Sequence, residues 1–380
     1  MGQRKCIFHL PFTPDPINRP SGTNIRPGKM LQGFKDGGYD VFEIIGESNY
    51  RAKRIREAKK LINNGETFDF VYSESETMPT MLTDKDHLPR HPFMDFAFMR
   101  FCRSHGVPVG LFYRDAYWLS EEYAHIKKGF KGRISAPLFR YDLLQYRSAV
   151  DMLFIPSREF TSLFRSGLKE FSTCPLPSGT VISEPLARYA QDRVSSNRGV
   201  LKLVYVGCIT VGDAYDMTML FETVRELDCV ELTLCVRENE WCNVKEHYAP
   251  YLTDKVKIFH LKGDKMKNLL DEADVGLLFF EPSQYRRLCM PVKLFEYIEH
   301  GLPVISLRDT SAGRFINENE CGWTTRYSKE ALLDLVGSLV SDPMRVVQKK
   351  ESCKAAAARN TWEDRAAQVA RCLSEVKNLG

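Results

Sequence analysis

Short apolar runs alternate with amphipathic stretches along most of this chain. Such runs are typical of strands buried on both faces of a parallel sheet, and apolar residues at three- and four-residue spacing are typical of helices. In the first half the pattern predicts strands at residues 6–10, 39–45, 68–72 and 107–112, and helices at 25–35, 51–62 and 93–104. In the second half it predicts strands at 201–206, 231–236, 256–260, 275–280 and 303–307, and helices at 217–227, 266–272 and 291–301. This alternation predicts an α/β protein with two Rossmann-like, doubly wound domains that face a central cleft.

The alternation weakens after residue 155, and residues 174–184 are rich in proline, serine and glycine. We therefore expect an N-terminal domain at 1–180, a linker at 181–199 and a C-terminal domain at 200–355. The tail at 356–380 is expected to form a helix, because its apolar residues recur at helical spacing. They are Trp362, Ala366, Val369, Leu373 and Val376. The pattern leaves open whether this helix crosses back to the N-terminal domain or packs only on the C-terminal one.

The composition is that of an ordinary globular protein. The 380 residues are 43% hydrophobic and 27% charged, and the length is sufficient for two domain cores. No apolar run approaches the roughly 18 residues needed to span a bilayer. The apolar stretch at residues 6–12 is too brief for a signal peptide, so we expect a cytoplasmic protein.

Several classes of site are disfavoured by the residues that are missing. The eleven cysteines are scattered and odd in number, which argues against a disulfide framework and a structural zinc site. The sequence contains neither the glycine-rich dinucleotide or P-loop motifs nor a zinc-protease motif. These absences argue against a dehydrogenase, an NTPase and a zinc protease.

The most informative segment is residues 291–306, which follow an apolar strand and a polar loop at 281–290. The segment predicts a helix that begins at Pro291 and carries Lys293 and Glu296 in its first turns. Such a helix start can bind a phosphate, and Glu296 can accept both hydroxyls of a ribose. The alternative is that Lys293 and Glu296 form a solvated ion pair on a surface helix.

The pattern Pro-x-Lys-Leu-Phe-Glu-Tyr-x-x-x-Gly-x-Pro-Val-Ile resembles the donor-site signature of glycosyltransferases with the GT-B fold, especially family four. The resemblance implies that Glu296 binds the ribose of a nucleotide sugar and that Lys293 contacts its diphosphate. Many members have a second glutamate eight residues earlier, where this chain has Leu288. Because this glutamate is missing, contacts with the sugar are expected from Glu281 or from Tyr285, Arg286 and Arg287.

The resemblance implies further donor contacts, which are assigned by their order along the chain. Gly207, after a strand, matches the glycine turn beneath the diphosphate. Lys262, in the turn at 259–263, lies where the family holds the base, and Gly22 matches a first-loop turn that reaches toward the phosphates. Each glycine is equally compatible with an ordinary turn or a helix cap.

The acceptor side is assigned to the segment after the strand at 107–112. Asp115 could orient an acceptor hydroxyl or receive its proton, and Trp118 offers a flat face for a sugar. Arg114 is included as an acceptor-side residue. Alternatively, Arg114 and Asp115 form a pair that fixes the loop.

The resemblance implies a hexosyltransferase that uses a nucleotide-diphosphate sugar, most simply a UDP-sugar, without a tightly bound cofactor or a metal. Retention is favoured, with the leaving diphosphate helped by Lys293; inversion would need a carboxylate such as Asp115. The acceptor would be a glycan or a lipid-linked sugar in polysaccharide or glycolipid assembly. Two alternatives stay open: a nucleotide-sugar epimerase of the same fold, and a catalytically silent partner subunit of another glycosyltransferase.

Basic residues gather in two parts of the first domain, at 51–60 and at 127–147, where apolar residues are interleaved. Such clusters could place the domain on the anionic inner face of a membrane, or they could be ordinary solvated surfaces. The modest net charge of +4 argues against nucleic acid as a partner.

Overall fold

The computed structural model of the protein describes residues 3–18, 21–120, 130–164, 171–182, 199–213 and 215–379. The chain divides into two compact units, the first formed by Met1–Gly179 with Trp362–Gly380 and the second by Thr180–Thr361. Most of the linker expected at 181–199 lies outside the described residues. Among the helices that are described, none is long and apolar enough to cross a membrane.

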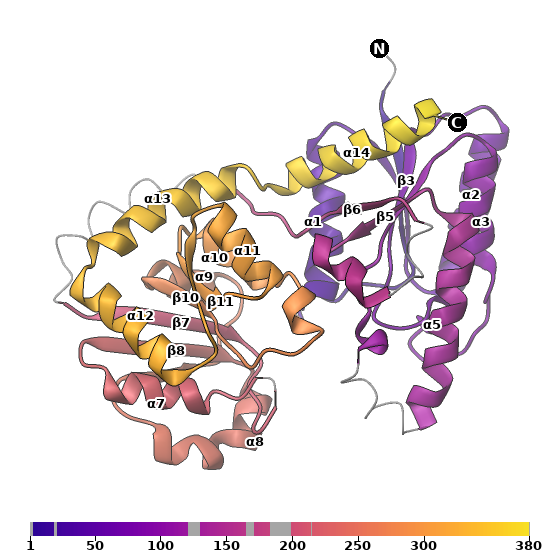
Figure 1. The fold of residues 1–380 in the computed structure, drawn as a ribbon. Coiled ribbons are helices and arrows are strands. Elements are labelled where there is room, and N and C mark those ends of the chain that lie inside the picture. Colours follow the sequence, from indigo (N-terminus) through magenta and orange to yellow (C-terminus); the bar gives the residue numbers. More distant parts are fainter. Residues whose placement is uncertain are drawn as a thin grey trace. The chain divides into compact units, whose positions relative to one another are not determined.

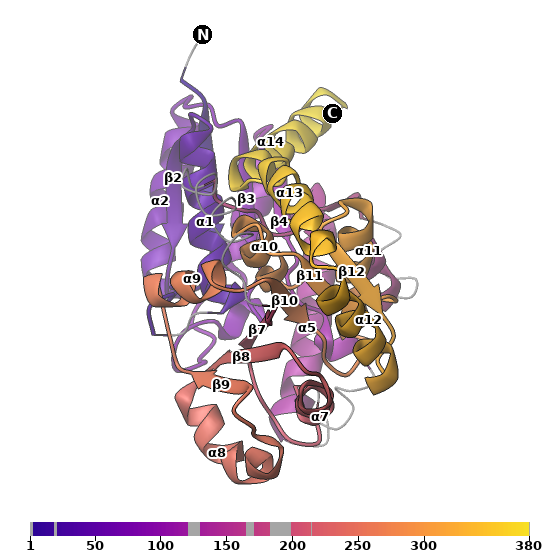
Figure 2. The same cartoon turned by 90° about the vertical axis from the view of Figure 1, so that its left-hand side faces the viewer.

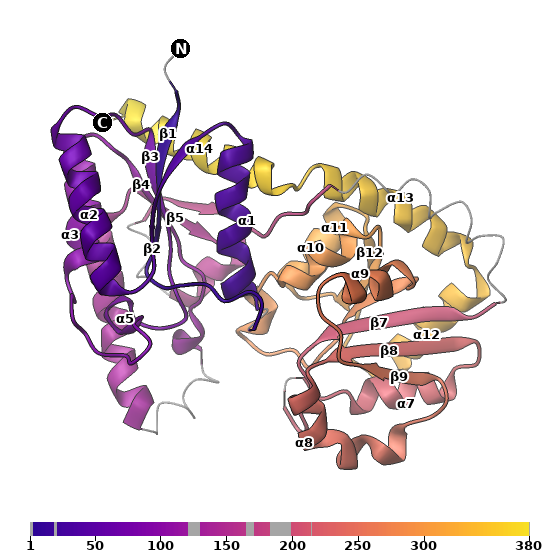
Figure 3. The ribbon, with the colours of Figure 1, turned by 180° about the vertical axis from the view of Figure 1, so that it is seen from behind.

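The N-terminal unit is built on a six-stranded parallel sheet with the order β2-β1-β3-β4-β5-β6 (Figure 1). The strands are β1 (Lys5–Leu10), β2 (Asp40–Ile45), β3 (Phe70–Glu74), β4 (Val109–Phe112), β5 (Met152–Ile155) and β6 (Thr173–Pro175). The helices are α1 (Gly22–Asp36), α2 (Ser48–Asn63), α3 (Met94–Ser104), α5 (Phe130–Ala149) and α14 (Trp362–Leu379). The helices α2, α3 and α5 pack side by side (Figure 3), and α14 packs against α1.

The packing of α14 on α1 depends on a glycine. A Cβ atom added at Gly33 of α1 would lie 2.6 Å from the carbonyl oxygen of Trp362, the first residue of α14. Leu373 of the same helix is fully buried, against Gly110 of β4. The two helices can therefore approach closely because residue 33 has no side chain.

The C-terminal unit repeats this arrangement with the strand order β12-β11-β10-β7-β8-β9 (Figure 2). Its strands are β7 (Leu201–Gly207), β8 (Val230–Val236), β9 (Val256–Phe259), β10 (Val275–Leu278), β11 (Val304–Leu307) and β12 (Gly322–Thr325). Its helices are α7 (Thr218–Glu226), α8 (Glu238–Tyr248), α9 (Asp264–Asp271), α10 (Val292–Glu299), α11 (Ser311–Glu318), α12 (Lys329–Ser341) and α13 (Met344–Ala358).

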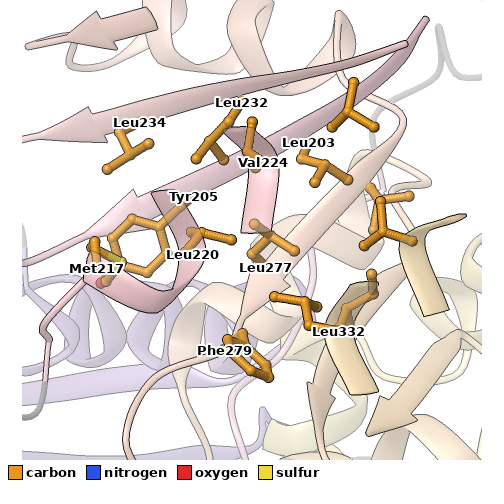
Figure 4. Packing of buried hydrophobic residues seen from close by; sticks show 14 of the residues in the cluster. Leu203, Tyr205, Met217, Leu220, Val224, Leu232, Leu234, Leu277, Phe279 and Leu332 are labelled. Atoms are coloured by element: carbon orange, nitrogen blue, oxygen red, sulfur yellow. The ribbon is translucent and has the colours of Figure 1, made fainter. Parts of the chain in front are cut away.

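Each face of the C-terminal sheet has its own hydrophobic core. On one face, strand residues such as Leu203 and Leu232 pack against Leu220 of α7 and Leu332 of α12 (Figure 4). On the other face, residues of α9, α10, α11 and α13 cover the sheet. Both faces of the strands are thus buried, which explains why their sequences are continuous apolar runs.

The predicted fold class is confirmed, because both units are parallel sheets flanked by helices. Several elements were missed by the sequence pattern. Helix α5 was read only as a basic and apolar stretch, and it contains Pro137. Helix α8 is polar on most of its surface, and β6 has only three residues. Short or weakly amphipathic elements of this kind carry little periodic signal.

Candidate functional site

In the C-terminal sheet, the order in which strands are added reverses between β7 and β10. The strands β8 and β9 follow β7 on one side, whereas β10, β11 and β12 extend the sheet on the other. The ladder between β10 and β7 joins only Val275 to Leu203 and Gly276 to Val204. Open α/β sheets bind ligands at the carboxyl ends of the strands at such a switch point. We define the carboxyl ends of β7 and β10 as the donor fork.

Tyr297 of α10 fills the gap between the two strands at the donor fork. Its hydroxyl accepts a hydrogen bond from the backbone N–H of Val206, at 2.9 Å, and lies 3.5 Å from the carbonyl oxygen of Leu277. A Cβ atom at Gly276 would lie 2.7 Å from the Tyr297 ring. Burial raises the pKa of Tyr297 well above its usual range, so the hydroxyl keeps its proton. Together these contacts fasten α10 across the switch point.

Helix α10 begins directly after Pro291, and its first two turns carry Lys293 and Glu296. Their side chains form an ion pair three residues apart and retain 27% and 21% of their exposure. The first N–H groups of a helix have no partner within it and favour an anion. The helix start therefore places an ammonium and a carboxylate, both partly accessible, at the edge of the donor fork. This ion pair is the contact expected if Lys293 and Glu296 only form a solvated pair on the helix surface. It is also compatible with a ligand-binding role.

Arg286 joins the loops that follow β7 and β10. Its guanidinium donates to the carbonyl oxygen of Glu281 at 3.2 Å and lies 5.2 Å from the centre of the Tyr215 ring. A carboxylate oxygen of Asp213 is 3.9 Å away. The side chain of Glu281 is exposed, and Tyr285 is half-buried. Arg286 thus shapes the loop edge of the donor fork by contacts with both loops.

Gly207 is the last residue of β7. A Cβ atom there would lie 2.6 Å from the hydroxyl of Tyr205, which itself donates to the carbonyl oxygen of Cys208 at 2.7 Å. The glycine is therefore required by the local turn, and the bare backbone faces the carboxyl edge of the sheet.

The turn after β9 also lies at the carboxyl edge of the sheet. Lys262 is exposed there, and the neighbouring carbonyl of Leu261 accepts a hydrogen bond from the thiol of Cys235 at 3.5 Å. Burial raises the pKa of that thiol, and the charge of Lys293 opposes the shift. Lys293, the end of β8 and the Lys262 turn are thereby brought into one neighbourhood. His260 is held by its own contact, with Nδ1 2.9 Å from the carbonyl oxygen of Val236.

In the N-terminal unit, Gly22 and Arg114 are brought together. Gly22 is the first residue of α1, and its carbonyl oxygen accepts a hydrogen bond from Arg114 at 3.1 Å. Arg114 also donates to a carboxylate oxygen of Glu74 at 2.6 Å. Burial lowers the pKa of Arg114, while the charge of Glu74 opposes that shift. Arg114 therefore fixes the loop after β4 to the end of β3 and the start of α1.

Asp115 is half-buried next to this network. One of its carboxylate oxygens accepts a hydrogen bond from the N–H of Tyr117 at 3.0 Å, at the start of the short helix η2 (Tyr117–Leu119). This contact is the usual local use of an aspartate at a turn. In this structure, then, Asp115 has a structural role in its own loop.

The proposed sugar-binding face of Trp118 is a prediction that the structure corrects. Trp118 is only 1% exposed, and its ring stacks on Phe139 of α5 with 5.4 Å between the centroids and 8° between the planes. The indole N–H donates to the hydroxyl of Tyr113 at 3.1 Å. Both the apolar face and the polar atom of Trp118 are used by the fold.

The basic cluster at 51–60 also needs a correction. Arg51 is 1% exposed, and its guanidinium donates two hydrogen bonds to Asp95, at 3.0 and 2.8 Å. By contrast, Lys53, Arg56 and Lys60 are exposed and line a shallow hollow of about 310 Å³ on α2, together with Glu57. In the second cluster, Arg140 and Arg147 are exposed, and residues 127–129 lie outside the described ranges.

Sequence reasoning missed three residues at the end of β3 and one on α1. Glu74 is fully buried and binds both Arg114 and Arg26 of α1, the latter at 3.4 Å. Ser75 accepts a hydrogen bond from the N–H of Arg114 at 3.0 Å, and Glu76 follows it. A signal existed, since two acidic residues alternate with serines at 73–76, just after the predicted strand at 68–72, but that strand ended too early to suggest it.

Comparisons with known proteins establish the fold. No protein-family model and no curated protein matches the sequence. Among solved structures, Anabaena HepE in complex with UDP-glucose is 12% identical, covers 98% of this chain and 99% of its own, and has a TM-score of 0.63. Sucrose-phosphate synthase from Thermosynechococcus elongatus is 12% identical, with 99% and 100% covered and a TM-score of 0.64.

A third solved structure is described as an epimerase, an activity different from sugar transfer. A Listeria monocytogenes protein described as a UDP-N-acetylglucosamine 2-epimerase is 13% identical, covers 100% of this chain and 98% of its own, and has a TM-score of 0.51. The expected GT-B fold is therefore confirmed. At these identities, the likeness concerns the fold alone.

Proposed function

We propose that this protein is a glycosyltransferase that moves a sugar from a nucleotide-diphosphate donor to a hydroxyl of a glycan or lipid-linked acceptor. One observation carries the proposal: the partly exposed pair of Lys293 and Glu296 lies at the start of α10, which Tyr297 fastens across the donor fork. A cation and a carboxylate in this position suit the diphosphate and the ribose of one ligand. The fold-level likeness to HepE, whose structure contains UDP-glucose, favours a UDP-sugar.

The residues of the donor fork then have separate roles. Glu296 accepts hydrogen bonds from the ribose hydroxyls, and Lys293 with the first N–H groups of α10 binds the diphosphate. These groups stabilise the negative charge that develops as the sugar leaves, which is the main catalytic demand of this reaction class. Gly207 allows close approach of the phosphates, Lys262 marks the turn beside the base, and Glu281, Tyr285 and Arg286 line the sugar side.

On ligand binding, the pair of Lys293 and Glu296 exchanges its internal contact for contacts with the donor. An ion pair between residues three apart on a helix, with both side chains partly in water, contributes only about 0–1 kcal/mol to stability, so the exchange costs little. We favour retention of the anomeric configuration, because the leaving phosphate can then take the acceptor proton without a side-chain base.

Two alternatives are supported by particular observations. The likeness to the Listeria protein favours a nucleotide-sugar epimerase, which would need the same donor fork but no acceptor. Leu288, in place of the second acidic residue, favours a catalytically silent partner subunit.

A panel of nucleotides and nucleotide sugars tests the proposal in two steps. A ligand at 100 times its dissociation constant stabilises the native state by about 2.7 kcal/mol, which thermal unfolding detects easily. We expect a selective shift with UDP and one or more UDP-sugars. Chromatography of the products after incubation then separates the three functions: free UDP indicates transfer or hydrolysis, an isomeric UDP-sugar indicates epimerisation, and an unchanged donor indicates the silent subunit.

The setting that we propose is glycolipid or polysaccharide assembly on the cytoplasmic face of a membrane. Its support is the exposed row of Lys53, Arg56 and Lys60 on α2 and the exposed Arg140 and Arg147 on α5. Near an anionic surface, each cation contributes about 1 kcal/mol and the attraction is screened by salt. Sedimentation with vesicles that contain phosphatidylglycerol should therefore occur at low salt and be weakened by Lys53→Glu with Lys60→Glu; equal sedimentation by the variant would argue against it.

A further inference from the structure

The N-terminal sheet has a switch point of its own, between β1 and β3. From β1 the chain passes to β2 on one side, and β3 extends the sheet on the other side of β1. The carboxyl ends of these strands are a second position at which α/β sheets bind ligands. We define the carboxyl ends of β1 and β3, with the loop that follows β3, as the N-terminal fork.

The buried carboxylate at the end of β3 is fully used by the fold. Glu74 receives hydrogen bonds from Arg114 at 2.6 Å and from the hydroxyl of Tyr72 at 2.9 Å, and Arg26 lies 3.4 Å away. Two guanidinium groups against one carboxylate leave the cluster with one net positive charge. Both oxygens of Glu74 are engaged within the fold, and its arginines set the charge of the N-terminal fork.

In Glu76, two residues after Glu74, the contacts of the carboxylate are incomplete. The N–H of Met78 bonds its carboxylate, and the charge of Arg114 acts on it. Its Oε2 atom is buried and has no hydrogen-bond partner within the part of the chain that the structure describes. Burial raises the pKa of this side chain above its usual value. A buried polar atom without a partner is costly to keep, so its presence in a native fold calls for an explanation such as a ligand.

We propose that Glu76 is the acceptor-binding carboxylate of this enzyme and accepts a hydrogen bond from a hydroxyl of a sugar acceptor at the N-terminal fork. The inference rests on the proposed glycosyl transfer, since it supplies the group that receives the second substrate. Asp115 and Trp118, which the sequence favoured for this task, are occupied by contacts within their own unit.

The charge around Glu76 indicates the class of ligand. The cluster of Arg26, Arg114 and Glu74 already carries one net positive charge, so a cationic ligand is disfavoured beside it. A neutral polyhydroxyl compound fits better, because its O–H groups donate to Oε2 without adding charge. Loss of such a hydrogen bond should weaken binding of the ligand roughly 10- to 100-fold.

The test compares Glu76→Gln with Glu66→Gln in the full chain. Glu66 lies before β3, at the amino end of the same strand, where it pairs with Lys5. Binding of octyl β-D-glucoside, below its micelle concentration, and of methyl α-D-mannoside is measured by saturation-transfer NMR. We expect the wild type and Glu66→Gln to bind at least one probe, and Glu76→Gln to bind it at least about tenfold more weakly. Equal binding by Glu76→Gln, or no binding of either probe by the wild type, overturns the proposal.

A stability measurement separates ligand binding from a structural role. If Glu76 serves the ligand, Glu76→Gln should match or exceed the wild type in urea unfolding at neutral pH, because an uncharged amide is cheaper to bury than a carboxylate. A clear loss of stability would assign Glu76 to the fold and overturn the proposal. Titration with UDP is the separate readout: its failure in the wild type counts against the donor site, whereas UDP binding with unaltered glucoside binding in Glu76→Gln counts against this inference alone.

Discussion

The hydroxyl of Tyr297 and the missing side chain of Gly276 together keep the donor fork open. Tyr297→Phe would leave the buried N–H of Val206 without a partner, at a cost of about 1–3 kcal/mol. Gly276→Ala would place a methyl group 2.7 Å from the Tyr297 ring, and such overpacking costs about 1–3 kcal/mol. Urea unfolding should show both losses, with Tyr50→Phe on the exposed surface of α2 as an unaffected control. Wild-type stability in both variants would mean that α10 is not held in this way.

Asp142 on α5 should make stability depend on pH. Burial raises its pKa to about 7, from an ordinary value of 3.8, and only Oδ2 has a described partner, the N–H of Thr80 at 2.7 Å. The folded state therefore holds a proton that the unfolded chain releases between about pH 4 and about pH 7. Since the native state binds more protons in this window, stability falls as pH rises through it.

Asp142→Asn removes this proton exchange while keeping an oxygen for the N–H of Thr80. We expect the variant to lose less stability than the wild type between about pH 4 and about pH 7, as measured by urea midpoints at each pH. Parallel losses in the two proteins would show that Asp142 does not titrate in that window.

At the residue scale, the sequence predicted the positions of side chains best where one segment contains all the residues that define them. Lys293 and Glu296 lie on a helix start that the motif alone defines. Trp118 failed as a prediction because its partner, Phe139, is distant in sequence and lies on a helix whose pattern was not recognised. An aromatic residue after a strand looks the same in sequence whether its ring is free or covered.

At the scale of elements, α1 offers a matched pair of glycines. Alanine favours a helix over glycine by about 1 kcal/mol, so Gly28→Ala should stabilise the protein, since no atom lies within 4 Å of its added Cβ. Gly33→Ala should instead destabilise the protein, because its Cβ would lie 2.6 Å from the backbone of α14. Thermal unfolding of the two variants measures the difference. A gain from Gly33→Ala equal to that from Gly28→Ala would mean that α14 does not pack on α1 as described.

The strands that carry the sites were predicted more reliably than the loops between them. The apolar runs of β7 and β10 are visible in the sequence because both faces of each strand are buried. The place where the two strands separate is not visible, since it depends on the hydroxyl of Tyr297 reaching Val206, 91 residues away in the chain. For the same reason the bonds that join Glu74 to Arg26 and Arg114 could not be predicted from local pattern.

At the scale of the molecule, two parallel sheets present two switch points with different chemistry. The donor fork joins a helix start to a cation and a carboxylate that remain partly exposed. The N-terminal fork has a buried, arginine-bound Glu74 and the Oε2 atom of Glu76, which has no hydrogen-bond partner among the described residues. The sequence motif predicted the helix start at the donor fork. The contacts of the N-terminal fork could not be predicted, because they join β3, β4 and α1 across the fold.

The most direct test of the central claim is calorimetric titration of UDP into the wild type and into Glu296→Ala. Glu318→Ala, which removes an exposed carboxylate from α11, is the matched control. We expect the wild type and the control to bind UDP equally, and Glu296→Ala to bind at least about tenfold more weakly, a loss of about 1.4 kcal/mol. Equal affinity in all three proteins, or no UDP binding by the wild type, would contradict a nucleotide-sugar site at the start of α10.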